Sequence, residues 1–162
     1  EATAGAVGSR GLELHHRLAR VAVPADGVLD LDDLARARCA DRVAEALVEA
    51  GAEGAVVDVG GVLRLAGSAA DGSAWVIEVP DPDEPGAVSA RLGIAEGACA
   101  TVLRPTAGLR SVTVLAADAA TAVVPAAAGD LDLLVASGRP ALVVSADGTY
   151  RGLGGVEGYL RR

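Results

Sequence analysis

The hydrophobic period of the sequence changes at Asp32. From Asp32 to Ala50 the apolar residues recur every three or four positions, as they do on one face of an amphipathic helix. These residues are Leu34, Ala37, Ala40, Val43, Ala44, Leu47 and Val48. One of the carboxylates at 30, 32 and 33 can cap the start of this helix, and Gly51 is a natural end. The flanking segments are short and read as strands, so the sequence predicts a mixed α and β chain.

Strands are predicted on both sides of this helix. Residues 12–24, "LELHHRLARVAVP", alternate well enough for one or two strands. After the helix, "AVVDV" from Ala55 reads as a buried strand, Gly60-Gly61 as a tight turn and "VLRLAG" as the hairpin partner. Further apolar strands are predicted at 74–79, 89–94, 98–103, 111–116 and 140–145, and a short helix at 130–138. Pro125 is expected to disrupt any helix in the Ala-rich segment around it.

The core must be built from small aliphatic side chains. Phe and Met are absent, and the aromatic residues are Trp75, Tyr150 and Tyr159. Val, Leu and Ala therefore have to fill the interior. A chain of 162 residues is long enough for one compact domain, so we expect a single domain over residues 1–162, with residues 1–11 flexible.

Charge and targeting signals narrow the classes of partner. The basic residues are all arginine, and the net charge of -8 argues against a nucleic-acid or anionic-membrane partner. No apolar run approaches a membrane span and no leader is recognisable, which leaves the compartment open. Cys39 and Cys99 form no CxxC pair and are expected to be buried hydrophobic side chains. The oligomeric state is also open.

Few residues carry chemistry by themselves. His15 and His16 are neighbours, so in a strand they face opposite ways and cannot bind one metal together. The carboxylates at 81, 83 and 84 lie among prolines and indicate a solvated loop rather than a calcium loop. No nucleophile elbow is recognisable in the sequence, so the motifs do not support a hydrolase. Gly60-Gly61 could admit a ligand to the backbone, but a Gly-Gly hairpin is common.

The order of several motifs resembles the ApbE-like family, the FAD:protein FMN transferases. In that family a strand Leu-Asp-Leu enters Gly-Gly-Ile-Ala-Lys-Gly, and an Asp follows. Here Leu29-Asp30-Leu31, Leu34-Ala35 and Asp41 match that frame. The family's Asp-Leu-Gly-Gly turn is similar to Asp58, Gly60 and Gly61 here. The later matching stretches are "DGSAWVIEVPDPDEPGA", "GACAT", "SVTVLAADAATA" and "DGTYRGLGGVEGYL".

This resemblance implies an α+β fold with a mixed or antiparallel sheet and packed helices. It implies magnesium-dependent transfer of FMN from FAD to a hydroxyl of an acceptor protein. FAD and magnesium are the cofactors implied. The residues that the resemblance assigns to cofactor binding are Arg36, Asp58, Gly60, Gly61 and Thr101.

The sequence departs from the family pattern where the chemistry takes place. Asp32 and Asp33 replace two glycines, and Arg36 replaces a lysine. The positions of the Asp and Thr metal ligands hold Val123 and Ala127, so no residue is assigned to catalysis or to the metal. Two interpretations stay open: a weakly active or inactive FMN transferase, and a non-catalytic module that binds flavin or protein.

Overall fold

A computed structural model describes residues 12–25, 27–105 and 108–161. They fall into two compact units, the first ending at Asp32 and the second beginning at Asp33. The flexibility expected for residues 1–11 lies outside the described residues, and the single domain stays a prediction. None of the helices in these ranges is long and apolar enough to cross a membrane.

The first unit holds a small antiparallel ribbon. Strands β1 (Glu13–His15) and β2 (Arg20–Ala22) pair in register and are joined by the 3-10 turn η1 (His16–Leu18). Every residue of both strands is exposed. The strands predicted for residues 12–24 are therefore confirmed. His15 and His16 belong to different elements, the strand and the turn.

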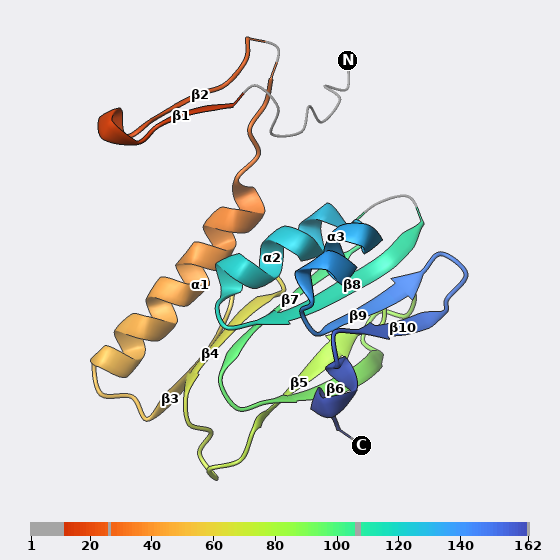
Figure 1. The fold of residues 1–162 in the computed structure, drawn as a ribbon. Coiled ribbons are helices and arrows are strands. Elements are labelled where there is room, and N and C mark those ends of the chain that lie inside the picture. Colours follow the sequence, from red (N-terminus) through yellow and green to blue (C-terminus); the bar gives the residue numbers. More distant parts are fainter. Residues whose placement is uncertain (1–11, 26, 106–107, 162) are drawn as a thin grey trace. The chain divides into compact units, whose positions relative to one another are not determined.

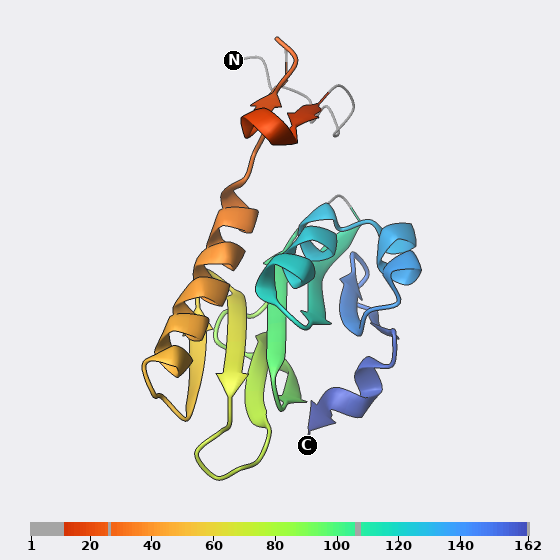
Figure 2. The same ribbon diagram turned by 60° about the vertical axis from the view of Figure 1, so that its left-hand side comes forward.

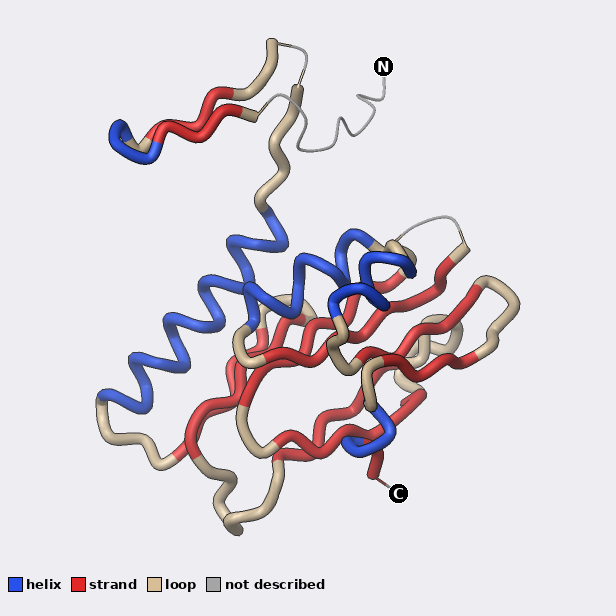
Figure 3. Tube along the Cα trace, in the orientation of Figure 1, coloured by secondary structure: helices blue, strands red, loops and turns tan. Residues whose placement is uncertain are grey.

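The second unit is built from two antiparallel sheets (Figures 1 and 3). The larger sheet has the order β10-β9-β8-β7-β4-β3 and the smaller has the order β11-β6-β5. The larger sheet comprises β3 (Gly54–Asp58), β4 (Val62–Gly67), β7 (Gly97–Leu103), β8 (Leu109–Ala116), β9 (Ala141–Ser145) and β10 (Tyr150–Leu153). The smaller comprises β5 (Trp75–Pro80), β6 (Val88–Ile94) and β11 (Leu160–Arg161). The bounds of β3 to β9 agree with the predicted strands to within a few residues at each end, whereas β10 and β11 lie where no strand was predicted.

Helices cover one face of the larger sheet, and the smaller sheet covers the other (Figure 2). The helices are α1 (Asp32–Glu49), α2 (Ala119–Ala128) and α3 (Leu131–Ser137), with a 3-10 turn η2 (Val156–Tyr159) near the end. Alternation along β7 divides the core in two. Ala98 and Ala100 pack in the cluster shared with the helices, whereas Cys99 packs in the cluster shared with β5 and β6.

The buried face of α1 is made of small side chains. Ala37, Ala40 and Ala44 are fully buried, but Leu34 and Leu47 are 36% and 44% exposed. The larger members of the periodic set thus flank the contact instead of filling it. A helix face of alanines is in keeping with a core that has no Phe or Met.

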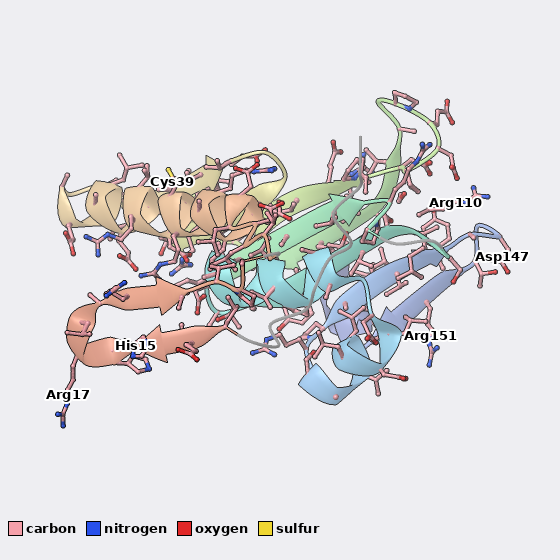
Figure 4. The ribbon with its side chains drawn as sticks, turned by 90° about the horizontal axis from the view of Figure 1, so that it is seen from above. His15, Arg17, Cys39, Arg110, Asp147 and Arg151 are labelled. Carbon is pink, nitrogen blue, oxygen red and sulfur yellow. The ribbon has the colours of Figure 1, made fainter. Side chains whose placement is uncertain are left out.

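Two expectations are wrong. Helix α2 continues through Pro125, because Asp118 caps its first turn, Gly129 ends it in the left-handed conformation, and its neighbours Ala122 and Ala126 are fully buried. Burial and capping outweigh the one hydrogen bond that proline removes. Cys39 is exposed on α1 (Figure 4), because it does not lie on the buried face formed by Ala37, Ala40 and Ala44.

Candidate functional site

A pocket of about 890 Å³ opens in the second unit, beside the turn between β3 and β4. The residues that line it come from the start of α1, from β3, β4 and the turn between them, and from β5 and β7. All five residues predicted to bind the cofactor line this pocket: Arg36, Asp58, Gly60, Gly61 and Thr101. The structure therefore brings the predicted set together, although the residues are spread over more than sixty positions of the sequence.

The β3–β4 turn requires both of its glycines. Gly60 and Gly61 have φ angles of 64° and 87°, in the left-handed region. A Cβ atom at Gly61 would lie 3.1 Å from the carbonyl oxygen of Thr101, and one at Gly60 would lie 3.3 Å from Nη1 of Arg36. The Thr101 amide donates to the Gly61 carbonyl oxygen at 3.0 Å, which ties the turn to β7.

Asp58 stabilises this turn with its side chain. Its Oδ1 atom accepts a hydrogen bond from the Gly61 amide at 2.9 Å. Aspartate often stabilises a turn by accepting a hydrogen bond from a backbone amide a few residues further along the chain. The Gly61 amide, one of the two that a Gly-Gly turn could offer to an anionic ligand, is therefore already engaged by the protein.

Arg36 lies at the rim of the pocket beside Gly60. It comes from the first turn of α1 and forms an ion pair with Asp33, with 3.4 Å between Nη2 and Oδ1. Both side chains are about two-fifths exposed, so this pair contributes little to stability. Its effect is on the field in the pocket, because Asp33 also lines the cavity and offsets the charge of the arginine.

Thr101 and Cys99 are two residues apart and lie on the same face of β7. The Thr101 hydroxyl lies 3.0 Å from the hydroxyl of Thr113 on β8, so it is positioned by a neighbouring strand. Cys99 is fully buried, and burial raises the pKa of its thiol to about 12. A thiol with that pKa is protonated at neutral pH and does not act as a nucleophile.

The sequence analysis missed the apolar wall of the pocket. This wall contains Val62, Leu63, Val76, Ile77, Val102 and Leu103. Glu78 also lines the cavity, and its Oε1 atom is 2.9 Å from Nη2 of Arg91 on β6. The strands were predicted, but no local signal shows that the end of β7 and the start of β5 face the same space.

A buried carboxylate joins α1 to α2. Asp41 is 2% exposed, and its two oxygen atoms accept hydrogen bonds from the amides of Ala119 and Ala120 at 2.8 and 3.2 Å. Nε of Arg64 lies 3.7 Å from Oδ1 of Asp41. Negative charge is favourable at the start of a helix, where the first amides lack partners within the helix. Asp41, the last residue of the family frame, thus has a structural role.

The chain does not offer the ligands that the resemblance assigns to magnesium. Val123 is 1% exposed and belongs to the core, and Ala127 carries no donor atom. In the three ranges that the structure covers, no group of three or more His, Cys, Asp or Glu side chains could hold a metal ion. The residues present at these positions therefore do not fit magnesium.

The acidic loop between β5 and β6 is held by its own carboxylates. Asp81 accepts hydrogen bonds from the amides of Asp83 and Glu84 at 2.8 and 3.1 Å. These bonds, chiefly the one from Asp83, lower the pKa of Asp81. Arg110 from β8 pairs with Asp83, and its side chain lies by the loop of Asp147 (Figure 4).

Comparison with solved structures places the fold among flavin transferases. The chain is similar to the ApbE protein of Thermotoga maritima, with a TM-score of 0.85 and 23% identity, over 96% of this chain and 60% of that one. It is also similar to the flavin transferase ApbE of Vibrio cholerae (TM-score 0.76, 24% identity, 94% and 59% covered). For the flavinyl transferase ApbE of Pseudomonas stutzeri in its apo form, the TM-score is 0.75 at 17% identity, with 95% and 56% covered.

These likenesses confirm the α+β fold. The chain spans under two thirds of the length of each of these three structures. A comparison with curated proteins found no match. The profile of the ApbE family matches residues 1–102, which is more than half of the sequence. The resemblance drawn from the motifs is thereby confirmed, and the chain belongs to the ApbE family.

Proposed function

We propose that this chain binds a flavin in the pocket beside the β3–β4 turn and transfers FMN weakly or not at all. The observation that carries the proposal is the burial of Val123. Its position is the one at which the resemblance predicts a metal-ligating aspartate, and its side chain belongs to the core between α2 and the sheet. With valine there, this position offers no ligand for the ion that offsets charge in phosphoryl transfer.

Flavin binding is supported by the lining of the pocket. Aliphatic side chains from three strands form one wall, and Arg36, Asp58 and Thr101 supply polar atoms at the rim. A largely apolar cavity with a few polar groups is typical of sites for planar organic ligands. The volume of about 890 Å³ lies within the range of such sites.

The alternative is intact FMN transfer to a hydroxyl of an acceptor protein. The family match over residues 1–102 favours it, as does the positive charge that Arg36 keeps at the position of the family's lysine. It requires metal ligands other than the side chains of Val123 and Ala127. The acceptor protein and the oligomeric state stay predictions.

Two measurements separate these functions. The protein is incubated with FAD, magnesium and a hydroxyl-bearing acceptor protein, while AMP release and the mass of the acceptor are followed. We expect flavin binding, seen as quenched flavin fluorescence, with little or no AMP. Robust AMP release with a matching mass increase would establish transfer instead.

A variant pair tests whether the pocket is the binding site. Arg36→Ala should weaken the binding of FAD, because it removes the cation at the rim and leaves the phosphates of FAD facing carboxylates. Arg42→Ala is the matched control, because Arg42 lies on the same helix, is exposed and does not line the cavity. Equal FAD affinities of the two variants would place the site elsewhere, and an unquenched wild type would end the proposal.

A further inference from the structure

The charges that line the pocket are unbalanced. Three carboxylates, those of Asp33, Asp58 and Glu78, face one guanidinium, that of Arg36. Arg91 pairs with Glu78 but does not itself line the cavity. A cavity with an excess of negative charge repels anionic ligands, and the repulsion is strongest where salt and water screen least.

Two groups that could bind a phosphate at the glycine turn, the Arg36 guanidinium and the Gly61 amide, already have carboxylate partners. Asp33 forms an ion pair with Arg36, and Asp58 accepts the hydrogen bond of the Gly61 amide. The Arg36 side chain lies next to Gly60, so the carboxylates of Asp33 and Asp58 both contact groups at this turn. A phosphate entering there would have to displace both contacts and would meet both carboxylates at short range.

The same groups suit a ligand that donates hydrogen bonds. Ionised carboxylates are acceptors only, and sugar-alcohol hydroxyls are donors that match them. The aliphatic wall of β4, β5 and β7 suits an uncharged planar ring. A ring on that wall with a hydroxylated chain directed to the turn satisfies both parts of the cavity.

We propose that the pocket selects a flavin without phosphate, riboflavin or a close analogue, over FMN and FAD. Asp33 sets this preference, because it both neutralises Arg36 and adds negative charge to the cavity. The inference rests on the proposed flavin binding and specifies its ligand. It also accounts for the aspartate that stands where the family pattern has a glycine.

The test measures the affinities of riboflavin, FMN and FAD for the full chain by fluorescence quenching at low and at high salt. A phosphate within several ångströms of an exposed carboxylate should weaken binding about fivefold at low salt. We therefore expect riboflavin to bind about fivefold more tightly than FMN, with the gap narrowing as salt is raised.

A pair of variants of equal charge assigns the effect to one side chain. Asp33→Asn should raise the affinity for FMN by about fivefold and change that for riboflavin less than about twofold. Glu45→Gln removes the same charge from an exposed position on the same helix, away from the cavity, and should change neither.

The outcomes separate this inference from the function on which it rests. FMN or FAD binding as tightly as riboflavin in the wild type would overturn the inference and leave flavin binding intact. An Asp33→Asn protein that keeps the riboflavin preference would overturn the role of Asp33. No quenching of any of the three flavins would overturn both proposals together.

Discussion

The β3–β4 turn and helix α2 are two of the regions in which the family resemblance predicts ligand-binding residues. At the turn, Gly60, Gly61 and Asp58 keep the family's residue types and line an open pocket. In α2, the two predicted ligand positions carry aliphatic side chains, and Val123 is buried. The turn borders an open cavity, whereas Val123 of α2 packs in the core. Changing the charge of a cavity leaves the fold intact, whereas restoring a ligand in a core would destabilise it.

Restoring the carboxylate of α2 should give the largest effect. Val123→Asp places a charged group among aliphatic side chains, and we expect it to lower the free energy of unfolding by about 4 kcal/mol. Urea denaturation measures the change. Val124→Asp is the control, because Val124 is 54% exposed, and it should cost less than about 1 kcal/mol. A stable Val123→Asp protein that binds magnesium would show that α2 is still a ligand site.

Removing the carboxylate that joins α1 to α2 should be nearly as severe. Asp41→Ala leaves the Ala119 and Ala120 amides without their acceptor and Arg64 without its buried partner. We expect a loss of about 3 kcal/mol, followed by thermal or urea denaturation. Asp132→Ala, at an exposed position of α3, should change stability little. Equal losses in the two variants would contradict the structural role of Asp41.

At the glycine turn the expected effect is smaller. Gly61→Ala imposes a left-handed conformation on alanine and brings its Cβ to 3.1 Å from the Thr101 carbonyl, so we expect a loss of about 2 kcal/mol. Gly72→Ala has a similar φ of 71° but open space around it. The difference between the two variants therefore measures the contact with β7. If they are equally destabilised, only the backbone angle matters at the turn.

The smallest effect is expected at Asp81, which lies in neither region and serves as a reference. Hydrogen bonds from the Asp83 and Glu84 amides lower its pKa in the folded state. A lowered folded pKa means that the carboxylate stabilises the fold above its unfolded pKa of about 3.9. This contribution is lost as pH falls through the lower folded value. Wild type and Asp81→Asn should thus differ slightly in stability at pH 6 and converge at strongly acidic pH, and a difference that grows on acidification would contradict this.

The fold was predictable where local chemistry determines it. Asp130 before α3 and Gly138 after it mark the ends of a helix that the structure confirms. The prediction that Pro125 disrupts the helix was wrong, because burial of its neighbours, a tertiary effect, outweighs the local preference of proline. Asp41 is 78 residues from the amide that it caps, and no local pattern reveals such a bond. The five predicted pocket residues were found through the family motifs. The apolar wall could not be predicted, because it forms only when distant strands pair.

The bond between Asp41 and the start of α2 also has a kinetic consequence. The amides of Ala119 and Ala120 gain this acceptor only when α1 has docked on the sheet, so the first turn of α2 cannot complete its hydrogen bonding earlier in folding. Closing a loop of that length is slow compared with forming a helix. Hydrogen exchange at these two amides therefore reports each opening of the interface between α1 and α2, even when the rest of α2 stays folded.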